Sequence, residues 1–240
     1  MTGPSDPSGP APRGPAVDDG SALLGAAAHE IKNALGPLAV TLELAERQLL
    51  AGQSIAPADV AFARSQVRRV ARLVADLMDL TRADLGHLSV EPAVVDLGAV
   101  VGGAIEIFKR GQSPGLPLTF TSPDPPLFAA VDAVRIEQVL LNLLENAVRY
   151  APLDSPIAVE LGRRGGRARL AVSDGGPGVP AAEMARVFDR FVRGSASKGT
   201  GGLGVGLYLC REIVERHGGT IGVDSPPGQG ATFWFELPCR

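Results

Sequence analysis

The heptapeptide HEIKNAL, residues 29–35, lies within a long helical pattern and decides how the rest of the chain is interpreted. Ser21 is a plausible N-cap for this helix, and apolar residues recur after it at intervals of three and four. The stretch AGQSIAP, residues 51–57, interrupts the pattern, and a second helical run then covers residues 58–85. Two helices joined by a short turn predict an antiparallel hairpin.

The apolar stripe of this hairpin is wider than a single hairpin can bury. Pairing two hairpins into a four-helix bundle would cover the stripe, so we expect a homodimer with an all-α domain over residues 21–86. Residues 1–20 hold five prolines and four glycines and almost no large apolar side chains, which predicts a flexible tail.

From Leu88 onwards short strands alternate with helices, so the chain is expected to be multidomain, with an α/β domain over residues 87–240. A mixed sheet with helices on one face, an α/β sandwich, fits this irregular alternation. The expected strands are Leu118–Thr121, Ile157–Leu161, Arg167–Ser173, Thr220–Val223 and Thr232–Leu237, and the expected helices are Leu97–Lys109, Asp132–Tyr150, Ala181–Val187 and Leu203–His217.

The composition disfavours several other classes of protein. A net charge of -3 disfavours a nucleic-acid binder, because such a protein normally carries a concentrated basic face. The two cysteines, Cys210 and Cys239, have no metal-ligand spacing and predict no disulfide framework. No stretch has the roughly 20 apolar residues of a membrane span, and the N-terminus does not resemble a signal peptide. We therefore expect a cytoplasmic protein with no nucleic-acid partner.

His29 falls between the apolar positions of its helix, so its ring is expected to face solvent. Only the neutral imidazole ring, which is well populated near physiological pH, can attack a phosphorus centre. Glu30 can accept the other ring proton or orient the ring, and Asn33 adds a neutral donor and acceptor one turn after His29. The alternative is a plain dimerisation stalk with His29 on its surface.

Three polar constellations fall on the α/β domain. Asn142 and Asn146 share one helix face, and amide oxygens suit Mg²⁺ when nucleotide phosphates complete its coordination, although ordinary helices also expose asparagines. Residues 174–178, DGGPG, follow a strand; their carboxylate can accept the exocyclic amine of adenine, although the same residues make an ordinary turn. The glycine-rich residues 198–210, KGTGGLGVGLYLC, open a helix whose amides can bind phosphate.

In their order along the chain, these motifs resemble those of the bacterial sensor histidine kinases of two-component systems, over residues 21–238. HEIKNAL resembles the family's H-box, NLLENAVRY its N-box, DGGPG its G1 box, VFDRFVRG its F-box and GGLGVGL its G2 box. The resemblance implies a dimerisation and histidine-phosphotransfer hairpin, followed by an ATP-binding domain of the GHKL type that uses ATP and Mg²⁺.

The resemblance also implies a role for each matching residue. His29 would be the phosphoacceptor, Glu30 the base that takes up its ring proton, and Asn33 the residue that positions water in a dephosphorylation reaction. Asn146 would ligate Mg²⁺, and Asn142 would assist it. The other implied nucleotide-binding positions are Asp174, which would recognise adenine, and Arg149, Tyr150, Gly176, Gly178, Phe188, Phe191, Arg193, Lys198, Gly202, Leu203, Gly204, Val205 and Gly206, with a lid over residues 193–201.

Asn142 bears on a competing class of protein, because DNA gyrase and the mismatch-repair ATPases use the same nucleotide fold. In those proteins the corresponding position resembles a glutamate that activates water. A neutral amide cannot act as a general base, so this chain is expected to hold ATP without hydrolysing it rapidly. A GHKL-type ATPase switch, or a non-catalytic phosphotransfer or scaffold protein, is the alternative.

The chain departs from the family pattern beside its histidine. The family usually has proline five residues after the histidine, where this chain has Ala34 and carries Pro37 instead, so any bend of the helix is displaced. No sensory domain and no receiver domain with its aspartate is recognised, so the signal and the next phosphoryl carrier are expected to come from elsewhere.

The function implied by the resemblance is that of an ATP-dependent protein-histidine kinase. It would phosphorylate itself on His29 and pass the phosphoryl group to an aspartate of a separate response regulator, which it would also dephosphorylate with the help of Asn33. The regulator would dock on the first helix just after His29, near Val40, Glu43 and Arg47.

Overall fold

A computed structural model of the chain describes residues 17–112, 116–152, 154–192, 194 and 202–239, with side chains described from Leu24 onwards. The chain divides into two compact units, Met1–Val70 and Ala71–Arg240, each of which is described by itself. Residues 1–16 of the expected tail lie outside the described residues.

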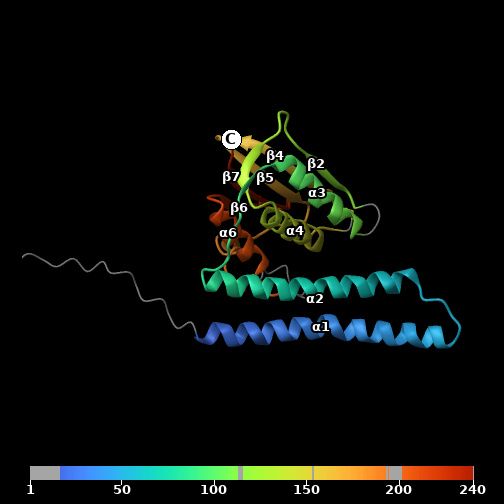
Figure 1. Ribbon diagram of the computed structural model, residues 1–240. Coiled ribbons are helices and arrows are strands. Elements are labelled where there is room, and N and C mark those ends of the chain that lie inside the picture. Colours follow the sequence, from blue (N-terminus) through green and yellow to red (C-terminus); the bar gives the residue numbers. More distant parts are fainter. Residues whose placement is uncertain (1–16, 113–115, 153, 193, 195–201, 240) are drawn as a thin grey trace, which may run out of the picture. The chain divides into compact units, whose positions relative to one another are not determined.

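The first unit contains helix α1 (Val17–Leu50) and the first half of α2 (Pro57–Asp84), which run antiparallel beside one another (Figure 1). The two predicted helices are thus confirmed, although α1 begins four residues before the expected N-cap, Ser21. The turn follows Leu50, where Gly52 adopts a positive φ of 71° that favours glycine. Helix α1 continues through Pro37, as first predicted from its apolar period.

The second unit contains a five-stranded sheet with strand order β2-β4-β5-β7-β6. Only β2 and β4 are parallel. Alternate residues of the three central strands are buried, so one face carries the core, and helices α3, α4 and α6 cover that face (Figure 1). The predicted α/β sandwich is confirmed. Its elements are β2 (Leu118–Thr121), β4 (Ile157–Arg164), β5 (Arg167–Asp174), β6 (Thr220–Asp224), β7 (Ala231–Pro238), α3 (Leu97–Arg110), α4 (Ala133–Tyr150), α5 (Ala181–Met184) and α6 (Gly206–Arg216).

A second, two-stranded sheet pairs β1 (Ala93–Asp96) with β3 (Phe128–Val131), and neither strand was expected from the sequence. An aspartate at the end of β1, Asp96, and one directly after β3, Asp132, cap the helices that follow. Asp96 Oδ1 accepts a hydrogen bond from Gly98 N at 2.9 Å, and Asp132 Oδ1 accepts one from Arg135 N at 3.2 Å. The small sheet therefore fixes where α3 and α4 begin.

The last part of α2, residues 71–84, belongs to the second unit and contacts α4. Asp79 Oδ2 accepts hydrogen bonds from Arg135 Nη1 at 2.7 Å and from Gln138 Nε2 at 2.8 Å. Glu145 forms an ion pair with Arg72, so the acidic side chain next to Asn146 is engaged by α2.

His217 joins the end of α6 to the start of α4. Its Nε2 accepts a hydrogen bond from the Asp132 backbone N–H at 2.9 Å, so the ring proton resides on Nδ1, which donates to Ile213 O at 2.8 Å. Both ring nitrogens of this buried histidine are therefore hydrogen bonded within the fold.

None of the helices in the described ranges combines the length and the apolar composition that a membrane span requires.

Candidate functional site

Helix α4 supplies one wall of the candidate nucleotide site. Its apolar stripe is buried against the sheet, which leaves Asn142 and Asn146 partly buried at the edge of the core. The Asn142 side-chain Nδ2 is buried, with the Cys210 thiol as a polar neighbour. Both polar atoms of the Asn142 amide would lie within 4 Å of a Cβ atom on Gly206, so the amide borders the glycine loop.

The glycine loop before α6 lies directly against this edge of α4. A Cβ atom on Gly206 would lie 3.8 Å from Asn142 Cγ, and one on Gly202 would lie 3.2 Å from Arg149 Nη1. Leu203 and Val205 are buried and anchor the loop. The predicted G2 glycines and N-box residues are therefore brought together.

The N-terminus of α6 offers unpaired backbone amides to a ligand. Its first residue is Gly206, three residues later than the expected start at Leu203, and Val205 at the N-cap position makes no side-chain capping bond. Gly204 adopts a φ of 69°, and a Cβ atom there would lie 2.9 Å from Val192 O. A helix N-terminus preceded by backbone this closely packed is suited to phosphate.

The G1 loop after β5 supplies further residues of the candidate site. Asp174 Oδ1 accepts a hydrogen bond from Gly176 N at 2.8 Å. Burial raises the pKa of Asp174, although hydrogen bonds from the Gly176 and Ala231 amides oppose the shift. A Cβ atom on Gly176 would lie 3.0 Å from Tyr150 O, so the loop packs against the end of α4. The half-buried carboxylate can accept an amine in this setting.

Two residues that sequence reasoning missed hold the G1 loop in place. Ser225 Oγ accepts a hydrogen bond from Val179 N at 2.8 Å and donates one to Gly230 O at 2.7 Å. A Cβ atom on Gly230 would lie 1.9 Å from Asp174 O, so only glycine fits there. The signal was present in the turn SPPGQG between two predicted strands, where a serine and a glycine flank the turn.

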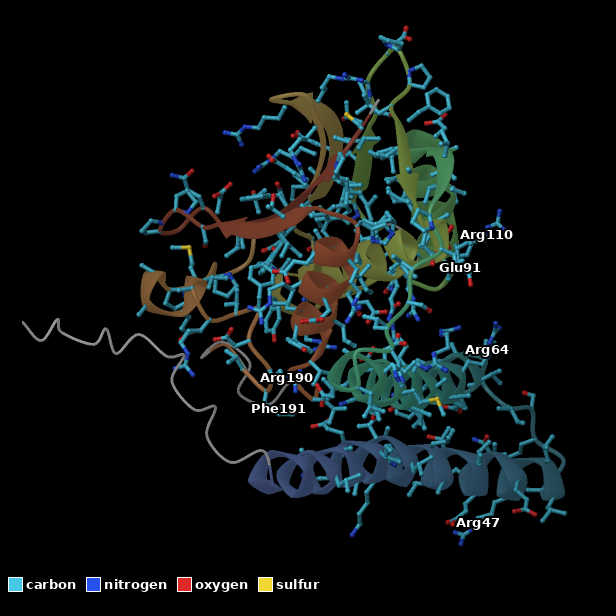
Figure 2. All side chains as sticks on the ribbon, turned by 60° about the vertical axis from the view of Figure 1, so that its left-hand side comes forward. Arg47, Arg64, Glu91, Arg110, Arg190 and Phe191 are labelled. Carbon is cyan, nitrogen blue, oxygen red and sulfur yellow. The ribbon has the colours of Figure 1, made fainter. Side chains whose placement is uncertain are left out.

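The F-box segment is tied to the G2 loop. Phe188 is buried and packs edge-on against Phe233, with ring centroids 6.3 Å apart. Phe191 has a φ of 61°, which is strained for a phenylalanine, and its N–H donates to Gly204 O at 2.9 Å. Arg190, beside Phe191 in Figure 2, donates to Tyr208 OH at 2.5 Å. The predicted contacts Arg193 and Lys198 lie outside the described residues.

The residues present fit a magnesium-bound nucleotide. The Asn142 amide lies beside the glycine loop, which has no room for a Cβ atom at Gly204 and leads into the uncapped N-terminus of α6. Asn146, one turn after Asn142, presents the kind of neutral oxygen that Mg²⁺ accepts alongside phosphates. No cluster of three or more acidic, histidine or cysteine side chains suited to a metal occurs within the described ranges.

The predicted phosphoacceptor lies in the first unit. His29 and Asn33 are exposed on α1, whereas Glu30 is only 7% exposed. Glu30 Oε2 lies 2.9 Å from Arg69 Nη2 on α2. Ala34, where the family usually has proline, is fully buried. The structure therefore places the histidine on the surface and its neighbouring carboxylate in the seam between the two helices.

The fold and the glycine loops define the second unit as an ATP-binding domain. The family described as Histidine kinase-, DNA gyrase B-, and HSP90-like ATPase matches residues 131–240. A solved structure of the mycobacterial sensor histidine kinase MprB is 30% identical, with a TM-score of 0.55, and the match covers 62% of this chain and 99% of that one. The chain therefore belongs to the bacterial sensor histidine kinases.

Other similar proteins extend the match into the hairpin. The sensor protein KdpD of Escherichia coli K12 is 35% identical over 218 residues, which are 91% of this chain and 24% of KdpD. The structure of histidine kinase ThkA in complex with response regulator TrrA shares the fold at 21% identity, with a TM-score of 0.62, over 93% of this chain and 62% of that one. The chain spans 24% to 58% of the length of curated relatives that it matches.

Proposed function

We propose that the protein is an ATP-dependent protein-histidine kinase that phosphorylates itself on His29. The observation that supports this most directly is the contrast between its histidines. His29 is exposed on a helix, while His217 is buried with both ring nitrogens hydrogen bonded. Of the described histidines, only His87 is also exposed, and it lies after the end of α2 rather than on it.

The reaction follows from the chemistry of the two sites. The His29 Nε2 lone pair forms a bond to the γ-phosphorus of ATP, the bond from that phosphorus to the β,γ-bridging oxygen breaks, and ADP leaves with the electron pair. The ring proton of His29 passes to Glu30. Magnesium, held by Asn146 and the phosphates, would neutralise charge on the phosphoryl groups. Asp174 would select adenine through its exocyclic amine.

Asn142 favours this reaction over hydrolysis of ATP. Its amide is neutral at every accessible pH and so cannot deprotonate water. Its position beside Gly206 instead suits it to holding the nucleotide and ordered water. ATP would therefore remain intact in the site until His29 attacks it.

The phosphoryl group would pass next to an aspartate of a separate response regulator. Val40, Glu43 and Arg47 are exposed on α1 after His29, and Arg47 points away from α2 (Figure 2). The structure of ThkA with TrrA supports this kind of partner, because that histidine kinase is seen in complex with its response regulator. Asn33, exposed one turn after His29, would position water for dephosphorylation of the regulator.

The kinase would act as a homodimer. Large apolar side chains of the first unit remain exposed, which is unusual unless a partner covers them. A second hairpin supplies the matching apolar stripe and would complete a four-helix bundle. Outside the proposed regulator-docking surface, the exposed residues are Leu24, Leu35, Leu42, Leu44, Leu49, Leu50, Val60, Phe62 and Val67. Light scattering during size-exclusion chromatography should give twice the mass of one chain, and Leu42→Glu should reduce it toward one.

Two measurements on the same sample test the proposed activity. Purified protein with Mg-ATP should gain phosphate that is labile to acid and stable to alkali, as a phosphoramidate is, while inorganic phosphate release stays slow. Steady release of inorganic phosphate without protein-bound phosphate would instead support the alternative ATPase switch. Nucleotide binding with neither product would support a scaffold or phosphotransfer protein.

A further inference from the structure

Glu30 is a charged residue in an apolar seam. It shares one face of α1 with Ala27 and Ala34, which are three residues before it and four after it and are both buried. The Glu30 side chain is 9% exposed. A carboxylate that is removed from water is unfavourable unless an opposite charge or hydrogen-bond donors compensate it.

Arg69 supplies that compensation from the facing helix. Its Nη2 donates a hydrogen bond to Glu30 Oε2 at 2.9 Å, across the hairpin and 39 residues further along the chain. Both residues lie within the first unit, and the Arg69 side chain is 37% exposed, so the guanidinium reaches into the seam from its edge. Charge-assisted hydrogen bonds of this length fix the orientation of a carboxylate as well as balancing its charge.

Arg69 is distinguished from the arginine beside it. Successive helical residues point about 100° apart, and Arg68 is exposed whereas Arg69 is partly buried. Only the Arg69 guanidinium pairs with Glu30 among the described residues. The two arginines therefore have the same charge and nearly the same place in the sequence, but only one has access to the carboxylate.

We propose that Arg69 is a positioning residue for phosphorylation of His29, holding the Glu30 carboxylate in the place from which it receives the ring proton. This inference rests on the proposed kinase activity. In the step concerned, the bond from Nε2 to phosphorus forms, the bond to the bridging oxygen of ADP breaks, and the proton of the His29 ring moves to Glu30. Arg69 touches neither ATP nor the histidine and acts through Glu30.

The test compares Arg69→Gln with Arg69→Lys and with the matched control Arg68→Gln in the full chain. We expect Arg69→Gln to lower the rate of autophosphorylation at saturating ATP by about tenfold or more, because general acid–base groups contribute on that scale or above. The KM for ATP should stay unchanged, since the nucleotide site lies in the other unit. Arg69→Lys, which keeps the charge, should recover part of the rate, and Arg68→Gln should match the wild type.

A double variant separates positioning from stability. Glu30→Gln removes the carboxylate, so adding Arg69→Gln to it should cause no further loss of rate. The double variant also leaves no unpaired carboxylate in the seam, so it remains informative if Arg69→Gln alone does not fold, and melting temperatures are measured for every variant. A rate for Arg69→Gln equal to that of Arg68→Gln, or a further loss of rate when it is added to Glu30→Gln, would overturn the inference. If the wild type itself gains no phosphate on His29, the proposed function fails instead.

Discussion

The two units of the chain differ in how they bury their apolar side chains. The nucleotide domain builds a continuous core from its sheet and the helices on it, whereas in the described part of the first unit only Ala27 and Ala34 are buried apolar residues. The nucleotide domain can therefore hold its ligand site with its own packing. The hairpin carries the proposed phosphoacceptor His29 on its surface, and in our proposal a second copy of the chain covers its apolar stripe. This difference predicts that the two proposed activities, binding ATP and accepting phosphate, can be disrupted by separate substitutions.

The largest effect is expected from Gly204→Ala, which breaks the nucleotide domain alone. Alanine at a φ of 69° is strained, and its Cβ atom would meet Val192 O at 2.9 Å. We expect ATP affinity to fall by about 10- to 100-fold, because a single residue held in a strained backbone conformation costs about 1–3 kcal/mol. Calorimetric titration with ATP measures this, and light scattering should show an unchanged dimer. Gly162→Ala, which meets nothing within 4 Å, is the control.

A change of chemistry within the same site is expected from Asn142→Glu. A carboxylate there could deprotonate water, so inorganic phosphate release should rise by about tenfold, toward the range general bases supply. Protein-bound phosphate should fall as ATP is consumed. Asn142→Gln, which has the length of glutamate without its charge, should not raise turnover. Equal turnover in the two variants would show that the neutral amide does not restrain hydrolysis.

The Asp174 carboxylate predicts a pH dependence of ATP affinity. Its ionised form accepts a hydrogen bond from the adenine amine more strongly than its protonated form does, so affinity should be constant above the pKa of Asp174 and fall as the pH is lowered through it. Because burial raises the pKa of Asp174, this loss should begin at a higher pH than for an ordinary aspartate. Titrations at successive pH values with ATP and with GTP measure the effect. Asp174→Asn should bind ATP more weakly, with an affinity that does not change with pH. If the affinity of that variant showed the same pH dependence as the wild type, another group would be responsible for it.

The smallest effect concerns stability of the second unit. Burial, and secondarily the charge of Asp79, raises the pKa of Asp76 to about 6 from 3.8. The folded state then binds the proton more tightly than the unfolded one, so ionised Asp76 lowers stability above pH 6, and this penalty disappears as the pH falls toward 3.8.

Asp76→Asn should therefore raise the free energy of unfolding at neutral pH by at least about 1 kcal/mol, the equivalent of one pKa unit, because the raised pKa already includes the attraction to Arg72 and Arg149. The stabilisation should vanish near pH 4. Thermal unfolding at the two pH values measures it, with Asp154→Asn, on an exposed residue, as the control. A stabilisation that persisted at low pH would have another origin.

The sequence predicted the elements in which buried and less buried residues alternate regularly. Strands β4, β5 and β7 alternate buried and less buried residues, and each was expected within three residues of its observed ends. Strands β1 and β3 were missed because four-residue strands such as FAAV have too few alternations to stand out. The start of α6 was placed at Leu203 because apolar periodicity cannot register the left-handed Gly204 inside the loop.

The sequence motifs predicted the candidate site residues, but not the contacts that hold these residues in place. Asn142 lies beside Gly206 of the G2 loop, and Gly176 of the G1 loop packs against Tyr150 O, while the roles of these residues in binding ATP stay predictions. The hydrogen bonds of Ser225 and the ion pair between Glu30 and Arg69 join residues that are distant in sequence, and neither Ser225 nor Arg69 belongs to a motif. Such contacts depend on helix register and strand pairing, which single-residue patterns do not specify.

The central claim, that His29 receives the γ-phosphate of ATP bound in the second unit, is tested most directly by comparing His29→Gln with His87→Gln. Both variants should bind ATP as the wild type does, because neither histidine belongs to the nucleotide domain's core. After incubation with Mg-ATP, His87→Gln should carry acid-labile phosphate at the wild-type level, and His29→Gln should carry none. Acid-labile phosphate on His29→Gln, at any level approaching the wild type, would contradict the account.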